Sequence, residues 1–341
     1  MEMKSYNRLR TTLAVMAAAF LCLTAYADDG IFLAKPEKAG SLAEIVGEKA
    51  NEIDSLAVEG PLNEADFNTL WEMGYKGWLE YLDLSKASPE GDRIPDHAFF
   101  HEYEQTEKSH IFGDRLIPLA YLNTVILPQN LKEIGEYAFA CTRIKSIMFP
   151  ESLQNIGAWS FYRCPALEGK ITFPGNIPEL KEYSFAECPK IEEIPSSVRC
   201  IWGFCFDRCH SLKKVDFSEG LDHISFYAFR ETRLETLILP KTFGTMHDGA
   251  FADVTTLKSI YSLNPNAPWA VTEALNGVKG AGNMRETDYS FTGTPTDIPV
   301  YIPVGSLSSY KSGNGWDRFT NLIECEDLPE LPHSGIEEMS A

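Results

Sequence analysis

Positive charge is scarce in this chain of 341 residues, which has 30 Lys and Arg against 49 Asp and Glu and a formal charge of −19. A surface this acidic repels phosphate groups, so the composition argues against nucleic acid and anionic membranes as partners. It favours solubility and suits basic partners or cation-screened sugars, although a solvated acidic surface without a specific role is the simpler interpretation.

The motifs of common enzyme classes are also absent. There is no glycine-rich phosphate loop, no His-Glu-x-x-His and no Gly-x-Ser-x-Gly. The His residues are scattered, apart from His97 and His101 beside a few carboxylates, where polar loop residues explain the pattern better than a cation site. We therefore predict a non-enzymatic protein without metal or cofactor. A site in the irregular loops at 100–115 and 264–299 is the enzymatic alternative.

Long hydrophobic runs are missing after the N-terminus, so the mature chain is not expected to enter a membrane. The first residues read as a signal peptide over 1–27. Basic residues come first, an apolar segment follows at 11–24, and Ala25-Tyr26-Ala27 suits cleavage. We expect export to the extracellular space, the cell surface or the periplasm. A lipoprotein anchor at Cys22 is the competing interpretation, and the bulky Leu21 before it argues against that.

What the chain does contain is a repeated phenylalanine. Eleven residues after each of six turn residues stands Phe139, Phe161, Phe185, Phe206, Phe229 or Phe251. A small residue precedes each Phe, and apolar residues stand three and six positions after each turn. A period of 21 to 24 residues predicts a solenoid, whose stacked coils bury their apolar ladders against one another.

Each coil begins with a short predicted strand that is apolar at its first, fourth and sixth positions, as in Leu122, Val125 and Leu127. Proline then ends the strand, and a short helical turn carries the small residue and the Phe. Successive strands must run parallel, which predicts an α/β solenoid of right-handed coils, with one parallel sheet and short helical turns on the other side.

Cysteines recur in the same register. Cys141 stands thirteen residues after its turn, and fourteen residues after theirs stand Cys164, Cys188 and Cys209. The next coils have Thr232 and Val254 at the fourteenth position, which indicates a buried slot for small residues. Coils about 4.8 Å apart would spread four sulfurs over about 14 Å, too far for one zinc ion. We expect free buried thiols, with a disulfide between neighbouring coils as the alternative.

The chain divides into five predicted segments. They are the signal peptide (1–27), an N-terminal cap with irregular first repeats (28–121), regular repeats (122–263), a closing module (264–325) and an acidic tail (326–341).

The repeat unit from Leu122 to Cys141 resembles that of the BspA-type leucine-rich repeat proteins, which are bacterial surface and secreted proteins. The segment from Val300 to Phe319 resembles the closing module of that family, and the segment from Ala39 to Ser85 resembles its first repeats. The resemblance implies a leucine-rich repeat solenoid, an envelope or extracellular location, and a binding function such as adhesion to host proteins.

The outward position between the fourth and sixth strand residues is the candidate binding site. Apolar residues recur there, and lysines flank them. The candidate strip consists of Ile126, Met148, Thr172, Asp216, Ile238, Tyr261, Lys145, Lys213 and Lys214. Apolar residues rimmed by charge are typical of protein-binding surfaces, although single outward apolar residues are also common. We predict an adhesin-like protein that binds a host or envelope protein through this strip. The alternative is a carbohydrate-binding or scaffolding component of the cell envelope.

Overall fold

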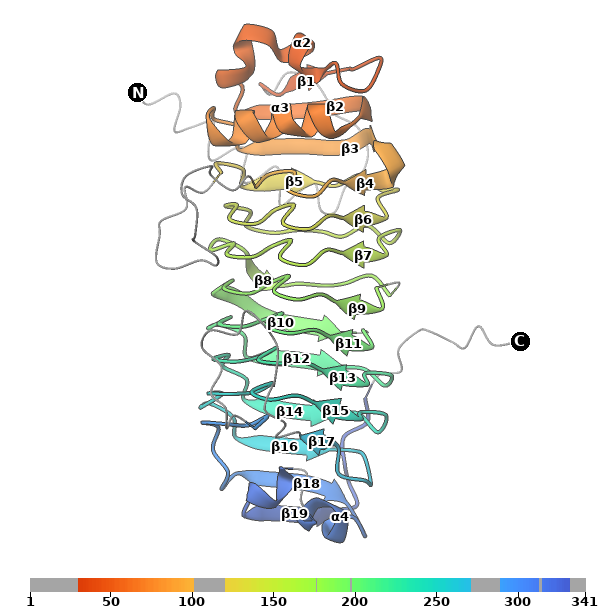
Figure 1. Cartoon of the computed structure of the whole chain (residues 1–341), viewed down its shortest axis with the longest axis vertical. Helices are drawn as coiled ribbons and strands as arrows, with labels where there is room; N and C mark the ends of the chain where they lie inside the picture. Colours follow the sequence, from red (N-terminus) through yellow and green to blue (C-terminus); the bar gives the residue numbers. More distant parts are fainter. Residues whose placement is uncertain are drawn as a thin grey trace, which may run out of the picture. The chain divides into compact units, whose positions relative to one another are not determined.

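A computed structural model describes residues 30–100, 120–175, 177–196, 198–270, 289–312 and 315–331. The chain divides into two compact units after residue 31, and every helix and strand of the described residues lies in the second. In that unit the coils follow one another in chain order from β1 to β19 (Figure 1). The predicted signal peptide and most of the acidic tail lie outside the described residues.

Each coil has three sides, and hydrogen bonds join neighbouring coils on all of them. The first side carries the longer strands, which pair in parallel within three sheets. The first sheet contains β1 (Phe32–Ala34), β2 (Ser55–Leu62), β3 (Tyr81–Pro89) and β5 (Thr124–Ile126). The second contains β8 (Glu168–Lys170), β10 (Lys190–Ser196) and β12 (Lys214–Phe217). The third contains β14 (Thr236–Leu239), β16 (Ser259–Ser262), β18 (Pro299–Pro303) and β19 (Asn321–Cys325).

The second side carries strands of two residues each, which follow the turn after the long strand. One sheet contains β4 (Arg93–Ile94), β6 (Glu133–Ile134) and β7 (Asn155–Ile156). The other contains β9 (Glu179–Leu180), β11 (Cys200–Ile201), β13 (His223–Ile224), β15 (Thr245–Met246) and β17 (Trp269–Ala270). The leucine-rich repeat fold is therefore confirmed, but five sheets replace the single predicted one. The first two sheets of the first side are separated at residues 144–149, where the coil has no strand and only isolated bridges, such as Thr124 to Ser146, join it to the preceding coil.

The third side is built of β-turns, which corrects the predicted short helical turns. In each regular coil, the residues two before and two after the Phe tend to have positive φ, as in Tyr183 (φ 55°) and Glu187 (φ 55°). Left-handed residues interrupt a right-handed helix. The Phe N–H instead donates across to the next coil, as from Phe161 to the Ser184 carbonyl at 2.8 Å. We call this side the turn face.

The phenylalanines form a continuous stack through the core, as predicted. Phe185 and Phe206 are fully buried, and ring centroids along the stack lie 5.1 to 5.6 Å apart. Phe99 adds a ring at the beginning and Phe291 adds one at the end. Phe291 was not predicted, because its coil lies in the segment expected to be loops.

Short helices and aromatic residues close the two ends. The N-terminal helices are α2 (Leu42–Val46), η1 (Gly47–Asn51), α3 (Glu64–Tyr75) and η2 (Glu90–Asp92), and the C-terminal ones are α4 (Leu307–Lys311) and η3 (Trp316–Arg318). Near the start, the buried Asp66 carboxylate accepts hydrogen bonds from the backbone of Gly40, Leu42 and Asn63. At the other end, Tyr310 and Trp316 are fully buried, and the Trp316 indole donates to the Pro268 carbonyl at 2.8 Å.

The predicted slot for small residues is present, and every cysteine in the described part is a free thiol. The Cys188 thiol donates to the carbonyl of Phe161 on the preceding coil at 3.1 Å, whereas the Thr232 hydroxyl donates to the carbonyl of Phe229 in its own coil at 2.8 Å. Cys141 was assigned to this slot wrongly. Thr142 occupies it, bonded to the Phe139 carbonyl at 2.9 Å, while Cys141 packs in a small separate cluster on the turn face.

Candidate binding surfaces

The predicted strip lies on the side of the longer strands, and none of its members is buried. Met148 is the most exposed of its apolar residues, at 73%. The side chains of Ile126, Ile238 and Tyr261 are half-buried. Alternation along the strands explains this orientation, because their neighbours Val125, Leu237 and Ile260 point into the core.

Strand register brings part of the strip into one line. Ile238 pairs with Tyr261, Tyr261 with Tyr301, and Tyr301 with Ile323 on β19. The rings of Tyr261 and Tyr301 stack at 4.7 Å. We call these four residues the C-terminal strip. Tyr301 and Ile323 were missed in the sequence, because β19 was not predicted and β18 was read only as a closing strand.

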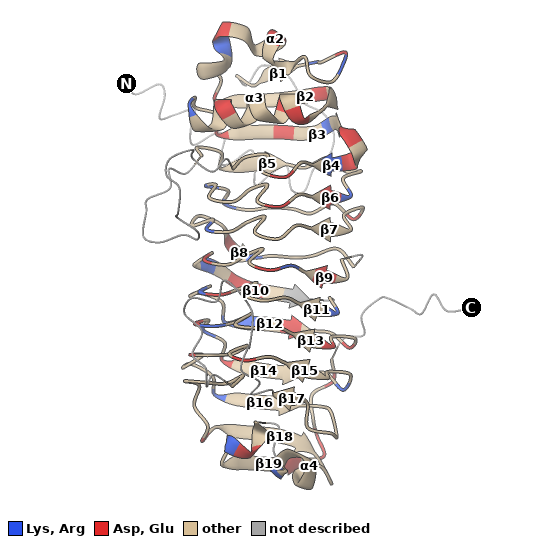
Figure 2. Ribbon diagram, viewed as in Figure 1, with Lys and Arg blue, Asp and Glu red and all other residues tan. Residues whose placement is uncertain are grey.

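The strip is not apolar throughout. Asp216 lies between the two apolar parts of the strip, and its carboxylate forms an ion pair with Lys214 at 2.6 Å. Lys213 and Lys145 belong to a row of outward residues in which charge alternates, because backbone bonds place Glu192 and Glu235 beside Lys213 and Glu168 beside Lys145. The three lysines therefore face acidic residues of their own chain. Figure 2 shows acidic and basic residues interspersed along the coils.

A second candidate surface lies on the turn face. Two residues before each Phe stands an aromatic or imidazole ring, and these rings stack from coil to coil. The aromatic row consists of His97, Tyr137, Trp159, Tyr183, Phe204 and Tyr227. The closest centroids are those of Trp159 and Tyr183, 3.7 Å apart. Gly249 follows at the next position, where an added Cβ would lie 2.3 Å from the Tyr227 ring.

The aromatic row could have been found in the sequence, since its period equals that of the core Phe. The left-handed backbone of this row could not have been predicted from the sequence, because non-glycine residues seldom adopt positive φ. Its rings lie nearly parallel, at 7° to 21° to their neighbours, so each ring covers the face of the next. All of them except the buried Tyr227 remain partly exposed.

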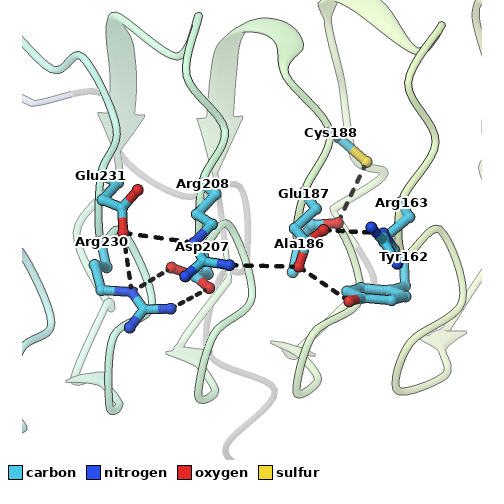
Figure 3. A network of polar contacts seen from close by, with 9 residues as sticks. All are labelled: Tyr162, Arg163, Ala186, Glu187, Cys188, Asp207, Arg208, Arg230 and Glu231. Carbon is cyan, nitrogen blue, oxygen red and sulfur yellow. Dashed lines mark hydrogen bonds and ion pairs between the residues drawn. The ribbon is translucent and has the colours of Figure 1, made fainter. Parts of the chain in front are cut away.

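Beside the aromatic row runs a charged row on four successive coils, formed by Arg163, Glu187, Arg208 and Glu231. Neighbouring members lie 3.0, 3.8 and 3.5 Å apart. Next to it, Arg230 donates two hydrogen bonds to the nearly buried Asp207 (Figure 3). Burial raises the pKa of the Asp207 carboxyl, and the Arg230 guanidinium opposes that rise.

Two histidines meet on the side of the two-residue strands. The rings of His223 and His247 lie 4.7 Å apart, and Phe226 packs against His247. Burial lowers the pKa of both imidazoles, and the charge of His223 lowers that of His247 further.

No catalytic or metal-binding group stands out in the described part of the chain. No three His, Cys, Asp or Glu side chains there are placed to hold a metal ion. An open pocket of about 310 Å³ has Glu64, Asn68, Asp96 and His97 in its lining. The other members of the His97 group noted in the sequence, from residue 101 onward, lie outside the described residues. Among residues with a described structure, no helix is long and apolar enough to span a bilayer.

Comparison with known proteins agrees with the coil geometry. The family described as "BspA type Leucine rich repeat region" matches residues 110–192 and 193–267, in six copies. The chain therefore contains a BspA-type leucine-rich repeat region. Proteins of this repeat family are generally non-enzymatic. No curated protein matches the chain.

A solved structure shows the same fold. A leucine-rich repeat protein from Bacteroides ovatus ATCC 8483 is 16% identical, with a TM-score of 0.51 over 80% of this chain and 70% of that one. A leucine rich cell surface protein from Faecalibacterium prausnitzii A2-165 is 15% identical, with a TM-score of 0.33 over 71% and 79% of the two chains. The pneumococcal vaccine antigen PcpA is 14% identical, with a TM-score of 0.38 over 80% of each. The first likeness shows the fold alone, and the other two are too distant to bear on this protein.

Proposed function

We propose that this repeat protein is exported and acts without catalysis, by binding a host extracellular or cell-envelope protein through the side of its longer strands. The observation that carries the proposal is the C-terminal strip, in which Ile238, Tyr261, Tyr301 and Ile323 occupy one line on four paired strands. Protein interfaces are enriched in aromatic residues at their centres, and a rigid repeat surface loses little entropy on binding.

Charge supports the same surface. The three lysines beside the strip face acidic residues of their own chain, so this side offers an apolar line with a locally balanced rim. Such a rim favours orientation of a partner over attraction from a distance. Met148, with an exposed fraction of 73%, extends the proposed contact toward the N-terminal coils.

A glycan is the second candidate ligand, because sugars stack on exposed ring faces. The aromatic row and the Tyr261–Tyr301 pair offer mostly edges, since their rings cover one another. Trp78 is the better platform, because its side chain is 58% exposed. Its ring lies 5.2 Å from the Tyr121 ring, and the Arg143 guanidinium lies 5.1 Å from Tyr121.

The test is binding of residues 28–341 to an array of host matrix proteins, envelope proteins and glycans. A variant with Ile126, Met148 and Ile238 changed to Lys is compared with the original. Loss of a protein signal by this variant, with an unchanged circular dichroism spectrum, supports the proposed surface. A signal that the variant retains moves the site elsewhere. Glycan signals lost on Trp78→Ala would instead favour the second candidate.

A further inference from the structure

The charged row on the turn face has a regular order of signs. Read from coil to coil, it is positive, negative, positive and negative, at Arg163, Glu187, Arg208 and Glu231. These side chains remain 26% to 40% exposed although they contact one another. A second surface can therefore meet them without first breaking the pairs inside the row.

An alternating row of four charges is complementary to itself when it is reversed. A two-fold axis between the coils of Glu187 and Arg208, perpendicular to the stacking direction, places these two residues opposite each other's copies. The same axis places Arg163 opposite the copy of Glu231. A parallel arrangement would instead place every charge opposite an identical one, which costs free energy. The sign order thus selects antiparallel coils.

The neighbouring aromatic row obeys the same symmetry. The axis places Tyr183 opposite the copy of Phe204, and both rings are partly exposed members of the aromatic row. Ring edges carry partial positive charge and pack well against the faces of other rings, and offset stacking of two rings is also favourable.

Net charge on this surface differs from that of the whole chain. Three basic residues, Arg163, Arg208 and Arg230, balance three acidic ones, Glu187, Asp207 and Glu231 (Figure 3). The chain as a whole has 19 more acidic than basic residues. Two copies would repel each other over most surfaces, whereas these six residues add no net charge where the copies would meet.

We propose that the turn face joins two copies of this chain in an antiparallel, two-fold dimer centred on Tyr183 and Phe204. This inference does not depend on the proposed function, because the longer strands occupy a different side of each coil. A dimer formed in this way would carry two copies of the proposed binding strip.

The test is the molar mass of residues 28–341 by light scattering and sedimentation, over a range of concentrations. We expect a dimer that dissociates as salt is raised. Two variants then isolate the charge pattern: Arg163→Glu with Arg208→Glu makes the row wholly acidic, and Glu187→Arg with Glu231→Arg makes it wholly basic. Each alone should dimerise about tenfold or more weakly, and an equimolar mixture should form a heterodimer.

Three outcomes would overturn the proposal. These are a monomer at every concentration of the original chain, a dimer that neither variant weakens, and folded variants that do not associate when mixed. Lys213→Glu with Lys258→Glu is the control, since it changes net charge equally on the other side of the coil. If a row variant is unfolded by circular dichroism, Glu187→Gln with Arg208→Gln replaces it, removes both central charges at constant net charge, and should also weaken the dimer.

Discussion

Arg230 donates two hydrogen bonds of 2.7 Å to Asp207 on the preceding coil, from a position where their side chains are only 14% and 5% exposed. Removing one partner leaves a charge with little access to water. We expect Asp207→Ala to lower the free energy of unfolding by about 3 kcal/mol. Denaturant unfolding measures this, and adding Arg230→Met to Asp207→Ala should cost less than Arg230→Met alone.

The exposed pair of Glu235 and Lys258 is the control for this prediction. Its ions are joined at 2.6 Å but remain in water, so Glu235→Ala should change stability very little. Equal effects at Asp207 and Glu235 would mean that burial does not strengthen the pair on the turn face.

The phenylalanine stack predicts a large effect for one core truncation. Phe185 is fully buried between Phe161 and Phe206, so Phe185→Ala should lower the free energy of unfolding by about 3–5 kcal/mol. Phe204→Ala removes a ring of the same size from the half-exposed aromatic row and should cost clearly less. Equal losses in urea unfolding would contradict the distinction between core and outer row.

The slot behind the Phe stack predicts a difference between two substitutions of equal size. Cys188→Thr keeps a donor in the slot, because Thr142 and Thr232 donate there to the carbonyl of the Phe in their own coil. Cys188→Val removes that donor, and should be less stable than Cys188→Thr by about 0.5–1.5 kcal/mol. Thermal unfolding of the two variants makes the comparison, and a more stable Val variant would show that the bond contributes nothing.

Stability should fall at mildly acidic pH because of His223 and His247. Burial lowers their pKa below the value of about 6.5 expected in the unfolded chain. Their contribution is therefore complete above that value and is lost as pH falls through the lower folded values. The Tm should decrease between pH 7.5 and 5, and His223→Gln with His247→Gln should reduce that decrease. An unchanged pH dependence in the double variant would contradict this.

The sequence predicted the parts of the fold that depend on hydrophobic period. Phe139 through Phe251, most strand positions and the outward strip follow from apolar residues recurring once per coil, but the strand expected over residues 144–149 is only an isolated bridge. Phe291 escaped because it stands 40 residues after Phe251, outside the 21 to 24 residue period. The β-turns escaped because nothing in Tyr183 or Glu187 as residue types favours positive φ; the hydrogen bonds of neighbouring coils hold them there.

The candidate site was predicted less completely than the fold. Alternation placed Ile238 and Tyr261 outward correctly, but joining them to Tyr301 and Ile323 required the register of β18 and β19. The ion pair between Lys214 and Asp216, and the acidic neighbours of Lys213, likewise depend on which coils lie side by side.

The central claim is that the C-terminal strip binds another protein, and affinity for a partner found on the array tests it most directly. Ile238→Lys with Tyr261→Lys should weaken binding about tenfold or more, because both change apolar positions in the proposed contact. Thr236→Lys with Ser259→Lys adds the same charge on the same strands, at polar positions beside the strip, and should have a much smaller effect. Equal losses in the two folded variants, or none in the first, would contradict the claim.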